Sequence, residues 1–171
     1  MRIRQVDKSD TDQFKEMVEL IDGESAFMLY QKGERNMTTN QFESMITSFV
    51  SQPNSTILVV EENRKLLGYV MAVGGKVARK KHTASIVLGV VQHHIGRGVG
   101  TYLMQSIEKW ANENGVTRLE LTTMVHNELA LALYKKMGFE VEGLRRQSFI
   151  IDGTGVDEYY LAKLLNSERG L

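Results

Sequence analysis

The feature that most restricts the fold is an apolar strand that passes through alternating glycines directly into a helix. Residues 88–101 read LGVVQHHIGRGVGT, with glycines at positions 96, 98 and 100. Glycine lets backbone N–H groups turn inward without a Cβ atom in the way, and a new helix adds unpaired N–H groups and a positive dipole end. The segment therefore predicts a site for a phosphate or pyrophosphate, to which Arg97 can add charge. A flexible turn without a ligand is the simpler alternative.

Two other phosphate-binding loops fit this segment less well. The Walker A pattern requires a lysine after its last glycine, whereas Thr101 follows Gly100. The Rossmann fingerprint is GxGxxG, and the spacing here is GxGxG. Glu120 lies 20 residues beyond Gly100, where a ribose-binding acid could stand, but the sequence shows only one strand–helix–strand crossover. Neither pattern is therefore favoured.

The periodicity along the rest of the chain predicts a mixed sheet. Helical patterns cover residues 11–20, 39–51, 99–114 and 127–137, and strand patterns cover 3–6, 55–61, 66–73, 83–91, 118–125, 139–142, 146–151 and 158–164. The crossover between strands 83–91 and 118–125 makes that pair parallel, while the other connections look like hairpins. We predict an α/β (α+β) fold: a mixed, mostly antiparallel twisted sheet of six to seven strands with one parallel crossover and flanking helices.

Length and composition limit the remaining possibilities. The 171 residues favour a single domain over 1–171 with a real core. Equal numbers of basic and acidic residues, 21 each, give no support for a broad basic surface that binds nucleic acid. The absence of cysteine excludes disulfides, thiolate–metal sites and a cysteine nucleophile. No signal peptide or membrane span is visible. We therefore predict a cytoplasmic protein with no metal, no nucleic-acid partner and no membrane partner.

Two segments resemble the motifs of the GNAT acetyltransferases. Residues 90–103, VVQHHIGRGVGTYL, are similar to motif A, [RQ]-x-x-G-x-[GA] after a strand, although the family's Arg or Gln falls on Ile95. Residues 126–139 are similar to motif B, N-x-x-A-x-x-x-Y-x-x-x-G-F, and match it at five positions: Asn127, Ala130, Tyr134, Gly138 and Phe139. Together the motifs make the resemblance specific from about residue 80 to 165.

The resemblance implies the GNAT fold, with its sheet split beside the parallel pair, and direct transfer from acetyl-CoA to an amine without a covalent enzyme intermediate. It assigns the coenzyme A contacts to backbone groups of the loop and the strand edge: Gly96, Arg97, Gly98, Val99, Gly100 and Thr101, with Leu88, Gly89 and Val90. Asn127 also contacts the cofactor, although it can equally be a helix N-cap. Tyr134 protonates the leaving thiolate, with a purely apolar core role as the alternative.

The general base is left open by the sequence. Many relatives place a Glu on the strand after motif A, and the matched position here holds Thr122, which can hold a water but is no base. Glu120 lies on the same strand face by alternation, and His82 begins the preceding strand. Both are candidates, and a structural role for each, with a water chain as the base, is the alternative.

The acceptor site and the partners are predicted only in outline. Glu24 and Tyr30 fall where relatives build the acceptor site, with a surface loop as the alternative. The basic run 79–82 is either a solvated turn or a contact for the coenzyme A 3′-phosphate or an acidic substrate. Residues 145–165 resemble a bacterial GNAT subgroup that acetylates amino acids, polyamines and other small amines and includes many dimers. We predict a homodimeric small-molecule N-acetyltransferase; the alternatives are a protein N-terminal or lysine acetyltransferase and an inactive CoA-binding regulatory module.

Overall fold

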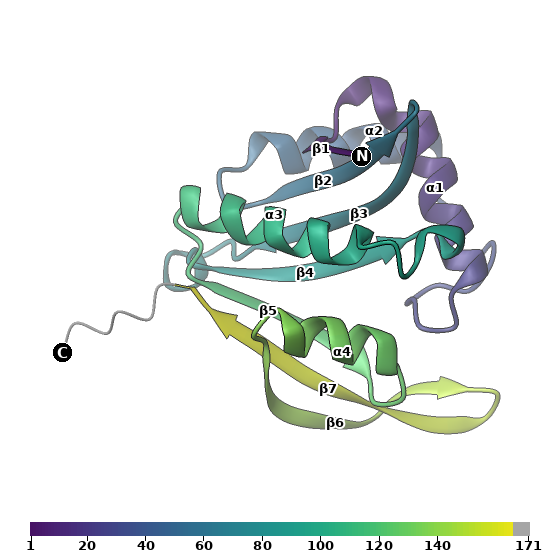
Figure 1. Ribbon diagram of the computed structural model, residues 1–171, viewed down its shortest axis with the longest axis vertical. Helices are drawn as coiled ribbons and strands as arrows, with labels where there is room; N and C mark the ends of the chain where they lie inside the picture. Colours follow the sequence, from purple (N-terminus) through teal and green to yellow (C-terminus); the bar gives the residue numbers. More distant parts are fainter. Residues whose placement is uncertain (166–171) are drawn as a thin grey trace.

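The strands form one seven-stranded sheet, in the order β1-β2-β3-β4-β5-β7-β6 (Figure 1), in the computed structural model, which describes residues 1–165. The strands are β1 (Arg2–Gln5), β2 (Thr56–Glu62), β3 (Lys65–Gly74), β4 (Thr83–Val90), β5 (Arg118–Met124), β6 (Glu140–Ile151) and β7 (Thr154–Leu164). Only β4 and β5 pair in parallel. The predicted mixed, mostly antiparallel sheet with one parallel pair is confirmed.

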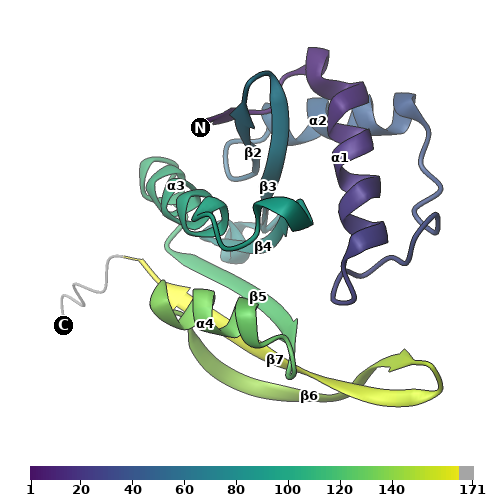
Figure 2. The same ribbon diagram turned by 45° about the vertical axis from the view of Figure 1, so that its right-hand side comes forward.

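Four α-helices cover the sheet from both faces (Figure 2). They are α1 (Thr11–Glu24), α2 (Thr39–Ser51), α3 (Val99–Glu113) and α4 (Glu128–Lys136). One apolar cluster joins α1 and α2 to the sheet and contains Phe14, Phe42 and Tyr69; the other joins α3 and α4 to the opposite face and contains Leu103 and Tyr134. Within residues 1–165, no helix is long and apolar enough to cross a membrane.

The parallel pair separates soon after it begins. β4 and β5 are in register only at Thr83–Ser85 opposite Arg118–Glu120. From Ile86 onward β4 keeps β3 as its partner, and from Leu121 onward β5 keeps β7. The two strands therefore diverge into a gap, visible between β4 and β5 in Figures 1 and 2. This is the split that the resemblance implies.

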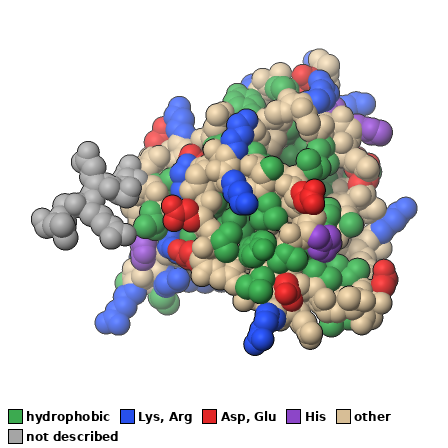
Figure 3. Space-filling view, turned by 60° about the horizontal axis from the view of Figure 1, so that its bottom comes forward, with side chains coloured by type: hydrophobic (Ala, Val, Ile, Leu, Met, Phe, Trp, Pro, Cys, Tyr) green, Lys and Arg blue, Asp and Glu red, His purple; other side chains and the backbone are tan. Residues whose placement is uncertain are grey.

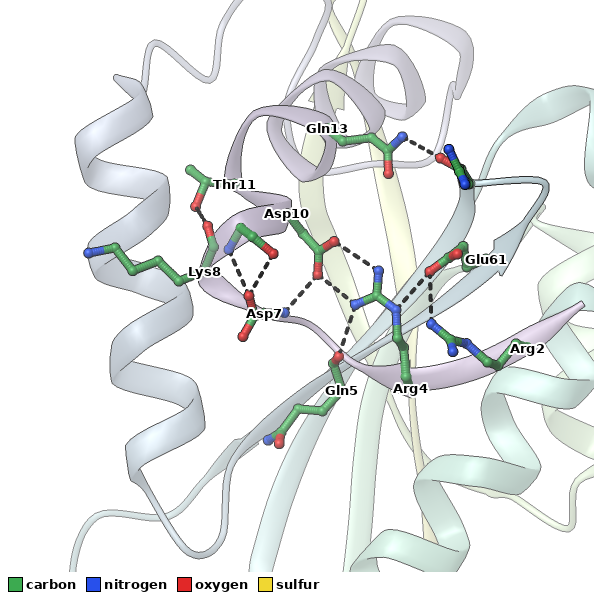
Figure 4. Close-up of polar contacts among 11 residues, drawn as sticks. Arg2, Arg4, Gln5, Asp7, Lys8, Asp10, Thr11, Gln13 and Glu61 are labelled. Carbon is green, nitrogen blue, oxygen red and sulfur yellow. Dashed lines mark hydrogen bonds and ion pairs between the residues drawn. The ribbon is translucent and has the colours of Figure 1, made fainter.

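The N-terminal strand is pinned by one arginine (Figure 4). Arg4 donates from its two terminal nitrogens to the Asp10 carboxylate, at 2.6 and 2.8 Å, and from Nε to Glu61 at 2.8 Å. These bonds tie β1 to the start of α1 and to β2. The hydrogen bond from Arg4 also lowers the pKa of Asp10. Asp10 is the N-cap residue of α1, but its carboxylate binds Arg4 and the Asp7 N–H and makes no cap bond to α1.

The closing strands differ from the prediction. Segments 139–142 and 146–151, predicted as separate strands, belong to one strand, β6, and β7 begins at Thr154 rather than at 158. The β6–β7 register shifts between Val141 and Gly143 and again between Arg145 and Phe149. Such bulges insert extra residues and interrupt the period-two pattern, so the sequence looked like two short strands. Asp152 and Gly153 form the turn between β6 and β7, with φ angles of 49° and 76°.

Candidate functional site

The glycine loop lies between β4 and α3. Gly96 and Gly98 have φ angles of 80° and 82°, in the left-handed region that favours glycine, and no atom lies within 4 Å of where a Cβ would stand on either. Gly98 is the N-cap of α3, and in the described part of the chain no side chain caps this helix start. The first N–H groups of α3, from Val99 to Thr101, are therefore left for an anion. The loop has the backbone geometry that a pyrophosphate site requires, and its binding of one stays a prediction.

Arg97 contributes less charge to this loop than the sequence suggested. One terminal nitrogen lies 2.8 Å from His94 Nδ1, and the other lies 3.5 Å from the Glu62 carboxylate. The side chain is half exposed. Because Glu62 offsets part of its charge, Arg97 is placed to serve a bound phosphate mainly through its backbone.

The edge of β4 offers alternate backbone groups to the gap. Val91 N–H donates to Leu67 O of β3 at 3.0 Å, and Gly89 stands opposite Tyr69 of β3. By the alternation of an antiparallel ladder, Gly89 and Val91 face β3, whereas Leu88 and Val90 turn their backbone groups toward the gap. Gly89, predicted as an edge contact, instead makes room for a core side chain, since a Cβ there would lie 2.6 Å from the Tyr69 ring.

The helix α4, which carries Tyr134, contacts the glycine loop through Leu133. Leu133 lies 3.1 Å from where a Cβ on Gly100 would stand, and Tyr134 packs in the same apolar cluster as Val99 and Leu103 of α3. Tyr134 is only 7% exposed, its ring centroid is 5.9 Å from that of Phe139, and burial raises the pKa of Tyr134 to about 12. The hydroxyl is therefore protonated at neutral pH. Tyr134 is a core residue by packing, and this position is compatible with a proton-donating role.

Asn127 is an N-cap. Its side-chain oxygen accepts a hydrogen bond from Ala130 N–H at 3.3 Å, at the start of α4. A cofactor contact through its amide nitrogen is compatible with this bond, because the cap uses only the oxygen.

Glu120 and Thr122 share one face of β5, as predicted. Glu120 accepts a hydrogen bond from Arg118 Nε at 3.0 Å, and the other nitrogens of Arg118 hold Glu142. Glu120 also stands at the last pair before β4 and β5 separate, and Thr122 lies beyond it in the gap region. Since Arg118 offsets the charge of Glu120, this carboxylate is poorly placed to attract the proton of an amine.

His82 and the basic run 79–82 lie at the wrong end of the sheet for catalysis. They precede Thr83, the first residue of β4, and the His82 carbonyl accepts from Thr117 and Arg118 N–H. Val90 is seven residues further along the strand, roughly 23 Å away at the usual rise. This position disfavours His82 as the base, whereas a contact of the run with the 3′-phosphate or an acidic substrate stays a prediction.

The segment after α1 reaches the open end of the gap. The Glu24 carboxylate accepts a hydrogen bond from Gln92 N–H at 3.0 Å, just after β4. The Phe27 ring centroid is 5.2 Å from that of His126, just after β5. Glu24 thus lies where the acceptor site was predicted. Phe27 lies between Glu24 and Tyr30, in the segment where relatives build that site. The role of His126 was missed, because its contact with Phe27 joins residues far apart in the sequence.

Tyr30 belongs to a different group of side chains. The Arg35 guanidinium lies 4.4 Å from the centre of the Tyr30 ring, and Arg35 Nε donates to the buried Asp22 at 2.6 Å. These contacts tie Tyr30 to α1, and nothing in them connects it to the gap. Among residues 1–165, no group of three or more His, Cys, Asp or Glu side chains is arranged to hold a metal ion.

Most of the chain, including the glycine loop and α4, matches a known protein family. A model of the acetyltransferase (GNAT) family matches residues 16–139, which is more than half of the chain. The chain belongs to the GNAT acetyltransferase family. It is similar to the L-amino acid N-acetyltransferase AaaT of Escherichia coli K12, with 39% identity over 87 residues, and to the N-alpha-acetyltransferase RimI of Mycobacterium tuberculosis, with 37% over 76 residues. These matches cover 50% and 44% of this chain and about half of each relative, 54% and 45%.

Solved structures share the whole fold of this GNAT acetyltransferase. A GNAT acetyltransferase from Streptococcus pneumoniae superposes with a TM-score of 0.93 at 25% identity, covering 96% of this chain and 99% of that one. The yncA protein of Salmonella typhimurium, solved with its cofactor acetyl-CoA, superposes with a TM-score of 0.86 at 20% identity, covering 98% and 95%. The predicted family and the GNAT fold are therefore confirmed.

Proposed function

We propose that the protein transfers an acetyl group from acetyl-CoA directly to a primary amine of a small molecule. The observation that carries this proposal is the uncapped start of α3, where two left-handed glycines lead the chain from the gap into the helix. A pyrophosphate bound there leaves the pantetheine arm to run along the free edge of β4. The presence of acetyl-CoA in the yncA structure supports the donor, and the name of AaaT supports an amino acid as the acceptor.

The residues around the gap can divide the reaction between them. Val90 N–H, on the edge of β4 that faces away from β3, polarises the thioester carbonyl. The amine attacks the carbonyl carbon, the C–N bond forms, and the C–S bond breaks. Burial raises the pKa of Tyr134 to about 12, so its hydroxyl carries a proton when the thiolate leaves. Tyr134 passes this proton to the sulfur as it receives one from the newly substituted, cationic nitrogen, so no charge remains on the buried oxygen.

Two other functions remain as alternatives to a small acceptor. The similarity to RimI, an N-alpha-acetyltransferase, favours a protein N-terminus. Thr122, in place of the family's glutamate, keeps open an inactive CoA-binding regulatory module. The open side of the gap, bounded by Glu24 and Phe27, accepts the small amine in our proposal.

The proposal is tested in two steps. Calorimetric titration with acetyl-CoA, with ATP and NADH as controls, should show micromolar binding of acetyl-CoA alone. Release of free thiol is then measured with a panel of L-amino acids and polyamines, and with peptides that carry a free N-terminus or an internal lysine. Turnover of small amines with none of peptides supports the proposal. Turnover of peptides alone selects the protein acetyltransferase, and binding without any turnover selects the regulatory module.

Self-association and the cytoplasmic location stay predictions. We propose that a second copy pairs along β6, which is an edge strand of the sheet. β6 exposes Val141, Leu144 and Ile150 by 48, 50 and 67%, and hydrophobic side chains gather on the face shown in Figure 3, where the bottom of Figure 1 comes forward. A Leu144→Lys variant should be monomeric by light scattering where the wild type is a dimer. A monomeric wild type contradicts this proposal.

A further inference from the structure

A backbone N–H group just beyond the end of β4 is bound by a side chain. Val91 N–H donates to Leu67 O of β3, so the next N–H along the chain, that of Gln92, is turned away from that ladder. Its acceptor is the Glu24 carboxylate at 3.0 Å, from the last residue of α1. A carboxylate from a distant helix is thereby fixed beside the part of β4 where no β5 partner is present.

Gln92, which holds Glu24, lies close in the chain to Val90, where we place the thioester carbonyl. Gln92 follows Val90 by two residues, which span roughly 6.6 Å in extended chain. An amine nitrogen attacking a carbonyl held at Val90 N–H would lie between that carbonyl and Glu24. The Gln92 bond uses only Oε2 of Glu24, and Oε1 keeps its acceptor capacity.

Glu24 differs from Glu120 and Asp22 in the kind of group that binds its carboxylate. Glu120 is bound by Arg118, and Asp22 is bound by Arg35 at 2.6 Å. The partner of Glu24 is instead a neutral backbone N–H, which orients the carboxylate without offsetting its charge. A cation such as an ammonium group is the ligand that this arrangement favours.

The two substrates would reach this point from opposite faces of the sheet. Tyr134 and the start of α3 belong to the apolar cluster on one face, whereas α1 packs on the other. Phe27, three residues after Glu24, contacts His126 and so lines the same open end of the gap from the α1 side. An acceptor that enters from the α1 side therefore meets Glu24 before it meets the thioester.

We propose that Glu24 binds the ammonium group of the acceptor and takes one of its protons. The inference rests on the proposed acetyl transfer. The ammonium gives a proton to Glu24 Oε1, the resulting amine attacks the thioester carbon, the C–N bond forms and the C–S bond breaks. Tyr134 passes the second nitrogen proton to the sulfur, and Glu24 releases its proton to water. The sum is one ammonium and one thioester converted to one amide, one thiol and one proton.

The Glu24→Gln variant tests this role, because glutamine keeps the length and an oxygen for the Gln92 N–H but loses the charge. With the best amine of the panel at pH 7, kcat/KM should fall by about 10²–10⁴-fold, the usual range for proton transfer by a positioned group. Acetyl-CoA affinity should stay within about threefold, since backbone groups hold the donor. The loss should shrink as the pH approaches the acceptor's own pKa, where the free amine needs no base.

Two further variants keep the test decisive. Glu19→Gln makes the same change on the same helix, at a residue paired with Lys15, and should behave like the wild type. Glu24→Asp keeps the charge and should retain the wild-type shape of the pH profile even if its rate is lower. If the kcat/KM of Glu24→Gln lies within threefold of the wild type at pH 7, or falls equally at every pH, the proposed role of Glu24 is overturned. The proposed acetyl transfer itself is not affected by that outcome. A wild type that binds acetyl-CoA and acetylates neither amines nor peptides overturns the proposed function first.

Discussion

In the proposed reaction, the two arms of the gap supply their chemistry in different ways. The β4 arm works through the backbone: left-handed Gly96 and Gly98, the uncapped start of α3, and Val90 N–H. The β5 and α4 arm works through side chains, above all Tyr134. A backbone site tolerates changes of side chain as long as the backbone conformation survives, which explains why Ile95 can replace the family's Arg or Gln. A side-chain site has no such tolerance, so substitutions in the two arms should have unequal effects.

The largest effect is expected from Tyr134→Phe, on the side-chain arm. Loss of the hydroxyl removes the proton donor while the ring keeps its packing, so kcat should fall by about 10²–10⁴-fold. Acetyl-CoA binding, measured by calorimetry, should stay within about threefold. Unchanged turnover would refute Tyr134 as the acid and would leave the side-chain arm without a catalytic group.

The same residue should make the fold sensitive to alkali. Burial raises the pKa of Tyr134 from 10.0 to about 12. The neutral hydroxyl is favoured in the folded state, so its contribution to stability is fully present below pH 10 and is lost as the pH rises toward 12. Urea unfolding at several pH values between 9 and 12 should show a shallower loss of stability for Tyr134→Phe than for the wild type. Equal slopes would mean that the hydroxyl is already well solvated.

On the backbone arm, the expected effect is intermediate and falls on binding. An alanine at Gly98 meets no neighbouring atom but must adopt φ near 82°, which costs an L-residue roughly 1–2 kcal/mol. If that cost appears in acetyl-CoA binding, the affinity falls by about 5–30-fold. Calorimetry measures it, and Gly143→Ala is the control, since Gly143 has neither a positive φ nor a crowded Cβ position. Equal affinities for both variants would contradict a backbone site.

A smaller effect is expected at Asn127, at the start of α4. Asn127→Ala removes the cap bond to Ala130 N–H, and loss of an N-cap costs about 1 kcal/mol in the free energy of unfolding. Asn127→Asp should restore the cap and hence the stability. Reduced acetyl-CoA affinity in the Asp variant, despite restored stability, would assign Asn127 a cofactor contact as well.

The smallest effect is expected at Arg97. Its side chain contacts His94 and Glu62 rather than pointing alone into solvent, so Arg97→Ala should change acetyl-CoA affinity by less than about threefold at 0.15 M salt. Calorimetry at two salt concentrations checks this. A tenfold loss that shrinks at high salt would give the backbone arm an ionic component that the geometry does not show.

The sequence was most informative where a feature depends on neighbours in the chain. The α2 bounds, the glycine loop and the cap at Asn127 follow from local pattern, and each is confirmed. His82 was misplaced because a strand position alone does not say which end of the sheet is catalytic. The Glu24–Gln92 bond and the Phe27–His126 contact join distant segments, and only the three-dimensional arrangement brings them together.

The short pairing of β4 with β5 has a consequence for the whole molecule. Within residues 1–165, the β4–β5 ladder that joins the two halves of the sheet has three residue pairs. A pantetheine arm bound in the gap would lie between β4 and β5 like an additional strand. It would restore contact between them where their pairing ends. Binding of acetyl-CoA would then stabilise the folded protein as well as supply the acetyl group. The added free energy of unfolding grows with the logarithm of the acetyl-CoA concentration above its Kd.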